Sequence, residues 1–204
     1  MAIEEHSVEV SKIRINEFQT VALLHKQHIS QGFLSSLGIP FLKLFYASMY
    51  DSQNAFCIVA RNERKEVIGF TAGCLDLKEF YKDFLKENLI KASFTLFPQI
   101  LRPNVFKKIL ETLLYPVKKP KKFPSAELVS IVVSPAYQGK GVSAQLFQAV
   151  KNAFTKRGIT KFKILVGSER RQACKFYEKM GCRFYCEIKV HKGEKSFVYV
   201  CNCL

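Results

Sequence analysis

The most constraining feature of the sequence is a glycine-bearing loop between an apolar run and an amphipathic run. Residues 126–133 are almost continuously apolar, as in a buried strand, and Ser134-Pro135 then turns the chain. Gly139 and Gly141 precede the stretch 141–157, whose apolar residues follow helical spacing. The positive end of a helix attracts an anion, and glycine lets the backbone approach a phosphate without a Cβ clash. Taken alone, such a glycine pair is also a common turn device.

The segments around this loop predict a mixed α/β (α+β) fold with one layer of sheet, parallel and antiparallel strands, and flanking helices. We expect one domain over residues 1–204, interrupted by an amphipathic helical insertion at 76–123, before the fourth main strand. The insertion carries the stripe Phe80, Tyr81, Phe84, Leu85 and Leu89 and a second stripe at 106–114, broken by Pro98, Pro103 and Pro116. The other predicted elements are strand 8–13, helices 15–29 and 41–50, hairpin 55–61/67–75, strand 162–166, helix 170–180 and hairpin 182–191/196–203.

Charge is distributed unevenly along the chain. The chain has 204 residues, an ordinary hydrophobic content of 48% and a net charge of +15. Residues 1–75 hold 7 basic and 7 acidic side chains, residues 76–125 hold 11 and 5, and residues 126–204 hold 14 and 5. The whole surplus therefore follows residue 75, and it predicts an anionic partner such as a phosphorylated cofactor, a nucleic acid or a lipid headgroup.

The cysteines and the hydropathy pattern indicate a cytoplasmic protein without a metal. Seven cysteines are present, in no C-x-x-C arrangement and with no signal peptide, so we expect reduced thiols. The pair Cys201 and Cys203 fits the alternation of a terminal strand better than a zinc site. No apolar run reaches the roughly 18–20 residues that span a bilayer.

Two phosphate-binding motifs fail at the glycine loop. The P-loop pattern G-x-x-x-x-G-K-[ST] is absent. Gly139, Gly141 and Ala144 fit G-x-G-x-x-A, and Glu169 follows the next strand. However, the glycines lie too far from the preceding strand, and the remaining chain predicts an antiparallel hairpin, which cannot complete a dinucleotide-binding fold.

The loop resembles that of the GCN5-related N-acetyltransferase (GNAT) family. The family's loop [RQ]-x-x-G-x-[GA] follows a strand ending in V-x-P, and here residues 138–143 read Gln-Gly-Lys-Gly-Val-Ser after Val133-Ser134-Pro135. Residues 173–184 are similar to the family's A-x-x-F-Y-x-K-x-G-F segment. Two positions depart from the family, Ser143 in place of Gly or Ala and Arg170 in place of Asn. The resemblance covers nearly the whole chain and implies a GNAT-type sheet and acetyl-CoA as the donor.

The resemblance also implies which residues contact the donor. Ile131, Val132 and Val133 would bind pantetheine through the main chain, although a buried strand alone explains their side chains. The remaining implied contacts are the loop and the start of the following helix, together with the helix after the next strand: Gln138, Gly139, Lys140, Gly141, Val142, Ser143, Ala144, Arg170, Arg171, Ala173 and Tyr177.

Proton transfer needs an acid and a base. Tyr177 stands where the family often supplies the acid to the CoA sulfur, although its helical stripe also fits a core aromatic. Glu127 and Ser130 on the strand before the loop are candidate bases, the alternative for Glu127 being a solvated carboxylate at a strand start. His25 and His28 have suitable ordinary pKa values, and the simpler interpretation is that each is a surface or half-buried histidine.

The acceptor is an amine that the sequence does not identify. Residues 33–46 are similar to a less characterised branch of the family and lie where its acceptor pocket is generally formed, so Phe33, Leu34 and His28 are candidate substrate contacts. We expect a small amine or amino sugar, with a protein or peptide amine as the alternative. The alternative of another class is a non-catalytic binding protein whose insertion contacts a membrane surface or nucleic acid. Packing of the insertion as a lid is favoured over membrane contact, and no nucleic acid is expected because no recognition motif accompanies the lysines.

Overall fold

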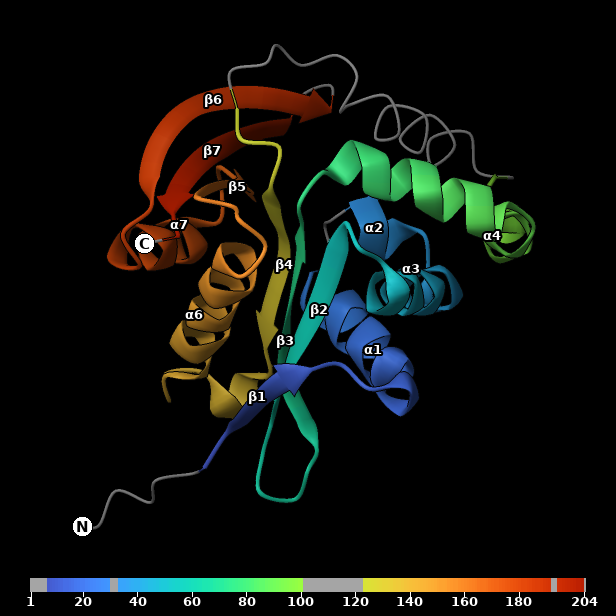
Figure 1. Cartoon of the computed structure of the whole chain (residues 1–204), viewed down its shortest axis with the longest axis horizontal. Helices are drawn as coiled ribbons and strands as arrows, with labels where there is room; N and C mark the ends of the chain where they lie inside the picture. The colour runs from blue at the N-terminus through green and yellow to red at the C-terminus, as the bar shows by residue number, and fades with distance from the viewer. Residues whose placement is uncertain (1–6, 30–32, 101–122, 192–193, 204) are drawn as a thin grey trace.

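A single mixed sheet organises the computed structural model, which describes residues 7–29, 33–100, 123–191 and 194–203 (Figure 1). Its strand order is β1-β2-β3-β4-β5-β7-β6. All neighbouring strands are antiparallel except β4 and β5, which are parallel. The strands are β1 (Glu9–Lys12), β2 (Ala55–Arg61), β3 (Val67–Cys74), β4 (Glu127–Val133), β5 (Lys161–Gly167), β6 (Arg183–His191) and β7 (Glu194–Asn202).

Helices cover both faces of this sheet (Figure 1). One face carries α1 (Phe18–His28), α2 (Phe33–Ser36), α3 (Ile39–Asp51) and α4 (Leu77–Ile100), whose apolar side chains share a core cluster with β2 and β3. The other face carries α6 (Val142–Thr155) and α7 (Arg171–Lys179), which share a second cluster with β5 and β7. Single 3₁₀ turns, η1 (Ile15–Glu17) and η3 (Pro135–Tyr137), precede α1 and α6. The predicted fold class, one mixed and mostly antiparallel sheet between helices, is confirmed.

The insertion differs in part from its predicted form. Phe80 and Phe84 of α4 are buried against Phe45 of α3, as a packed lid requires. Leu89, which the stripe also included, is 60% exposed, because it lies off the helix face that packs on the core, a face that continues with Ala92. The predicted break at Pro98 is wrong: α4 continues to Ile100, since the missing N–H of a proline near a helix end removes only one hydrogen bond. The second stripe, at 106–114, lies outside the described residues, and the extent of the insertion stays a prediction.

Two further expectations are corrected. Residues 33–36, predicted as part of a loop, form the short helix α2. Cys182 and Cys201 form a disulfide that ties the end of the α7 segment to β7, so the expectation of reduced thiols is wrong for this pair. Antiparallel pairing of β6 with β7 brings the two residues together, an effect that cysteine spacing in the sequence does not indicate. Cys203 is buried and free, as expected for a core residue of the terminal strand.

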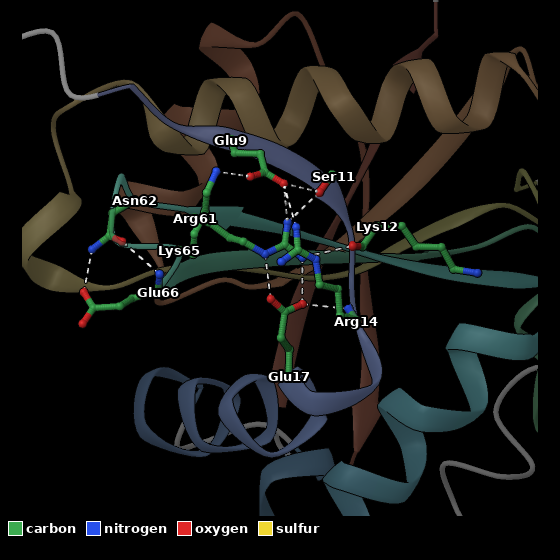
Figure 2. A network of polar contacts seen from close by, with 9 residues as sticks. All are labelled: Glu9, Ser11, Lys12, Arg14, Glu17, Arg61, Asn62, Lys65 and Glu66. Atoms are coloured by element: carbon green, nitrogen blue, oxygen red, sulfur yellow. Dashed lines mark hydrogen bonds and ion pairs between the residues drawn. The ribbon is translucent and has the colours of Figure 1, made fainter.

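A buried ion pair anchors β1 to the sheet (Figure 2). The Arg61 side chain is fully buried and donates through Nε to Glu17 Oε1 at 2.6 Å and through Nη1 to Ser11 Oγ at 2.6 Å. Arg61 Nη2 also donates to the main-chain oxygen of Lys12 at 3.2 Å. Glu9 binds Arg61, Arg14 and Lys65 in the same network. Removing one partner of such a buried pair typically costs about 3–5 kcal/mol, so the network fixes the position of β1.

Candidate functional site

The central opening of the sheet lies between its two parallel strands. β4 and β5 pair only at Glu127 with Lys163 and at Leu128 with Ile164, although β4 continues to Val133 and β5 to Gly167. The β3–β4 register shifts between Ala72 and Gly73, so Val129 is the extra residue of a bulge in β4. Bulges bend the strand that carries them, and this one lies where β4 leaves β5. In the described residues, the β5-facing edge of β4 beyond Leu128 has no strand beside it, which leaves main-chain groups of residues 129–133 for a ligand.

The glycine loop follows directly at the end of β4. Gly139 and Gly141 have φ of +76° and +80°, conformations that other residues adopt only with strain, and a Cβ on either would meet no atom within 4 Å. The loop is closed by Gln138, whose Nε2 donates to the main-chain oxygen of Val133 at 3.0 Å. Gly141 caps α6 without a side-chain hydrogen bond, so no capping side chain occupies the first N–H groups of this helix. Glycine conformation, open space and helix end together fit an anion, and they lie where the sequence predicted.

Basic side chains gather at the start of α7. Arg170 caps this helix, and Arg171 begins it and is exposed. The Arg170 Nε lies 3.6 Å from Glu169 Oε1, a contact in which both side chains are solvent-accessible and which therefore contributes little. Ala173 packs against the α6/α7 cluster, and the rings of Phe147 and Phe176 meet edge to face across the two helices. Two cations at a helix N-terminus oppose the helix dipole unless an anion lies nearby, as the sequence prediction supposed.

Tyr177 is buried on α7, with 7% of its surface exposed. Its ring contacts Phe147 of α6 and Tyr199 of β7, each at a centroid distance of 6.2 Å. Burial, and then the neighbouring Cys174, raise the pKa of the Tyr177 hydroxyl above its usual range. The phenol therefore keeps its proton at neutral pH. A protonated phenol is what a general acid requires, and this environment equally fits a core aromatic.

Glu127 lies at the point where β4 and β5 separate. Its carboxylate Oε2 lies 3.2 Å from Lys163 Nζ, which also donates to the main-chain oxygens of Pro124 at 2.7 Å and Ser125 at 3.1 Å. Both side chains are buried. The interpretation of Glu127 as a solvated carboxylate at a strand end is therefore wrong, because strands on both sides enclose β4 at this point. Protonation of a carboxylate in a buried ion pair weakens that pair, so proton acceptance by Glu127 would carry this cost.

A chain of polar side chains connects Ser130 to the interior of the α1/α3 layer. Tyr46 is fully buried, which raises the pKa of its hydroxyl, and the neighbouring Ser130 side chain opposes that rise. The Tyr46 hydroxyl also lies 2.5 Å from Nδ1 of His25, whose ring stacks on Phe70. Burial, and then the charge of Lys26, lower the pKa of His25 to about 4. His25 is thus a neutral, buried residue and not the surface or half-buried histidine that the sequence indicated.

The remaining acceptor-side candidates lie at the end of α1 and in α2. His28 is half-buried in the last turn of α1, as the simpler interpretation expected. Leu34 is half-buried against the α1/α3 core, and Phe33 begins α2. The Lys26 Nζ donates to the main-chain oxygen of Ser35 at 2.9 Å and so ties α1 to α2. These residues belong to the same face of the sheet as Tyr46, but no contact in the described residues joins them to the opening.

Sequence reasoning did not find Tyr46 or Lys163. Tyr46 fits the apolar stripe of α3 and reads as a core residue, and only the fold places its hydroxyl beside Ser130. Lys163 falls within the buried strand β5. A lysine inside such an apolar run is a signal in the sequence, because a buried charge needs a partner. This signal does not identify the partner as Glu127.

The described residues contain neither a cluster of metal ligands nor a membrane-spanning helix. No group of three or more His, Cys, Asp or Glu side chains in residues 7–29, 33–100, 123–191 and 194–203 is arranged to hold a metal ion. No helix in that part of the chain is both long and apolar enough to cross a membrane.

Comparison with known families identifies the class to which this fold and this glycine loop belong. The model of the GNAT acetyltransferase family matches residues 26–182. The chain belongs to the GNAT acetyltransferase family, as its two motifs predicted. A search of curated proteins found no significant match.

Solved structures share the fold at low sequence identity. A chimera of the spermidine N-acetyltransferase SpeG from Vibrio cholerae and hSSAT is 14% identical, with a TM-score of 0.62 over 96% of this chain and 95% of that one. The protein SsHAT is 17% identical, with a TM-score of 0.64 over 97% and 99%. An N-acetyltransferase from Staphylococcus aureus Mu50 is 11% identical, with a TM-score of 0.63 over 97% and 99%. At these identities the likeness shows the fold.

Proposed function

We propose that the protein transfers an acetyl group from acetyl-CoA to a primary amine of a small molecule or amino sugar. The observation that carries the proposal is the separation of β4 from β5 directly before an uncapped, glycine-lined helix N-terminus. The opening offers main-chain groups to a pantetheine arm, and the loop offers N–H groups to a pyrophosphate. One ligand that carries both parts accounts for both features.

The residues around the loop fit this donor. The loop and helix start from Gln138 to Ala144 would hold the pyrophosphate, with residues 131–133 along the pantetheine arm. Lys140, Arg170 and Arg171 add positive charge at the two helix starts, and each side chain reaches solvent. When bound, the donor supplies the activated thioester carbonyl that an amine attacks. The main-chain N–H groups of β4 would stabilise negative charge on that carbonyl oxygen.

The acceptor amine must lose a proton before or during attack. Glu127 and Ser130 are the two candidates on β4 itself, and both side chains are buried. His25 is 1% exposed, and its Nδ1 is hydrogen-bonded to the Tyr46 hydroxyl within the core, so we do not expect it to reach the amine. We therefore assign His25 and Tyr46 a positioning role toward the Ser130 side chain, and we assign Glu127 the role of accepting the proton through water.

Tyr177 is the proposed proton donor to the departing thiolate. Its raised pKa keeps the phenol protonated, and α7 lies on the same side of the sheet as the glycine loop. General acid catalysis is typically worth about 10²–10⁴ in rate. A buried phenol held between aromatic rings loses little entropy on donating to a fixed sulfur atom.

The identity of the acceptor rests on weaker support. A structural relative is a spermidine N-acetyltransferase, which supports a small amine acceptor. The protein or peptide amine stays the second acceptor class. Both classes use the same donor site and differ only in what binds the face formed by α1, α2 and α3.

The test is a screen of amines that follows release of the free CoA thiol by the purified protein. The panel holds polyamines, amino sugars, aryl amines and peptides with a free N-terminus or lysine. We expect turnover with at least one small amine, and acetyl-CoA binding by calorimetry in every case. Donor binding without turnover on any amine would support the non-catalytic alternative, and absence of donor binding would contradict the proposal.

The Arg171→Ala variant tests the donor site separately. If Arg171 faces a phosphate, its loss raises the KM for acetyl-CoA several-fold and flattens the salt dependence of that KM. Lys161, an exposed lysine at the start of β5, provides the matched control as Lys161→Ala. An Arg171→Ala variant that behaves like this control removes Arg171 from the donor site.

A further inference from the structure

A second concavity lies away from the proposed donor site. A cavity of about 350 Å³ is lined by β1, the first half of β2, the second half of α6 and the end of α3. β1 pairs with β2 from Ile58 to Arg61, and the Ile13 N–H donates to the main-chain oxygen of Cys57 at 3.1 Å, so the strand edge at Ala55 and Phe56 is left to form one wall. Apolar residues make its floor: Met49, Ala55, Phe56, Ile58, Ala149 and Ala153. This volume lies within the range of small-molecule pockets.

The charged residues around the cavity are all basic. Lys12, Lys156 and Arg157 line it, and no lining residue in the described part of the chain is acidic. They come from β1 and from the end of α6. None of the three forms an ion pair with a described carboxylate. A pocket with three cations and no counter-charge favours an anion.

Two of these cations are held in place by aromatic rings. The Lys12 Nζ lies 4.1 Å from the ring centroid of Tyr50, and the guanidinium carbon of Arg157 lies 4.9 Å from that of Phe56. Arg157 also donates through Nη1 to the main-chain oxygen of Ala153 at 3.0 Å. This bond offsets the negative end of α6 and uses one of the five guanidinium N–H groups, so further donors remain for a ligand.

Two acidic side chains that lie close to Lys12 in the sequence already have cationic partners. Glu9 and Glu17 belong to the Arg61 network, and Figure 2 shows the Lys12 side chain extending away from that network. Burial opposes ionisation of Glu17, but hydrogen bonds from Arg61 and from the Arg14 main chain lower its pKa overall. Both carboxylates are therefore fixed on their own partners. Neither of these two carboxylates forms an ion pair with Lys12.

We propose that this cavity is a second binding site, for a small molecule with a carboxylate or phosphate head on an apolar body. The head pairs with Lys156, Arg157 and Lys12, and the body lies on the floor formed by β2 and α6. None of the cavity residues is among the donor-site or acceptor-site candidates. The proposal of this second site is therefore independent of the acetyltransferase proposal, and either can be wrong without the other.

The experiment is a calorimetric titration of the intact protein with phenyl phosphate and phenylacetate, and with uncharged phenylacetamide as the control ligand. We expect saturable binding of the two anions and none of the amide. The double variant Lys156→Gln/Arg157→Gln should weaken anion binding at least tenfold, and Lys161→Gln should leave it unchanged. Both altered residues are exposed, and thermal unfolding of the variant measures the small loss of stability expected from the contacts of Arg157 with Phe56 and Ala153.

Two further variants localise the binding. Ala149→Leu fills the cavity and should weaken binding at least tenfold without changing any charge. Gly141→Val alters only the phosphate loop and should leave binding unchanged. No saturable binding of either anion, equal binding of phenylacetamide, or anion binding that is lost in Gly141→Val but kept in the double variant would overturn the proposal.

Discussion

The two faces of the sheet carry functional groups of different kinds. On the α6/α7 face, the proposed donor site consists of main-chain groups, two glycines and a helix end, all contributed by one continuous stretch of chain. On the α1/α3 face, the polar chain of His25, Tyr46 and Ser130 joins single side chains from three separate elements. The glycine loop is recognisable as a motif in the sequence, whereas the three polar side chains of the α1/α3 face form no sequence motif. Donor chemistry is consequently easier to read from this chain than acceptor chemistry.

The largest expected effect concerns the loop glycines. Gly141→Val places a β-branched residue at φ +80° and a side chain in the space proposed for phosphate. The left-handed conformation costs roughly 1–2 kcal/mol for a residue with a Cβ. We expect the Kd for acetyl-CoA, measured by calorimetry, to rise at least a hundredfold.

Gly158→Val is the matched control for this change. Gly158 has φ of +74° and equally open surroundings, but it follows α6 instead of preceding it. It should lose similar stability in thermal unfolding and keep the Kd of the parent protein. Equal loss of acetyl-CoA binding in both variants would mean that strain, and not the phosphate site, explains the effect.

Tyr177→Phe tests the acid on the same face. Removing the phenolic proton should lower kcat by about 10–100-fold while the Kd for acetyl-CoA stays within twofold, because a proton donor acts in the transition state. Tyr199→Phe, a neighbouring buried tyrosine whose hydroxyl donates to Glu178 at 2.8 Å, is the control and should keep kcat. An unchanged kcat in Tyr177→Phe would leave this residue as a core aromatic only.

Tyr46→Phe tests the opposite face. It disconnects His25 from Ser130 and leaves His25 Nδ1 buried without its partner, which typically costs about 1–3 kcal/mol of stability. We expect kcat/KM for the amine to fall about tenfold and its pH profile to shift, with acetyl-CoA binding unchanged. Tyr81→Phe, on α4, should change neither kcat/KM for the amine nor the pH profile of kcat/KM. A loss of stability without any kinetic change would restrict the chain to a structural role.

The smallest effect is the pH dependence of stability that His25 causes. The pKa of His25 is lowered by burial to about 4, whereas the unfolded chain has the ordinary value near 6.5. Below pH 6.5 the unfolded state therefore binds a proton that the native state refuses. Stability is full above pH 6.5 and falls as the pH drops toward about 4.

His25→Gln should flatten this dependence between pH 6.5 and 4.5. Denaturant unfolding at several pH values measures it, and the comparison uses the slope, so a uniform loss of stability in the variant does not matter. The lowered pKa of Glu17 acts at lower pH in both proteins. A parent protein with the same slope as His25→Gln would show that the imidazole is not buried in neutral form.

The sequence predicted the fold well, for physical reasons that differ between elements. Apolar alternation located the strands, and the glycine loop located the start of α6. The sequence did not show that Cys182 would meet Cys201, that Glu127 would be buried against Lys163, or that Leu89 would stay exposed on α4. Each of these depends on which strands or helices lie beside the residue. Residue spacing within one segment does not predict which other segments pack against that segment.

Amide hydrogen exchange, with and without acetyl-CoA, tests the central claim most directly. The opening between β4 and β5 and the glycine loop are proposed to hold one ligand, so acetyl-CoA should slow exchange at residues 129–133 and 139–144 together. The cavity wall at residues 55–57 should not change. Protection confined to other parts of the chain, or protection of the loop without β4, would contradict the account.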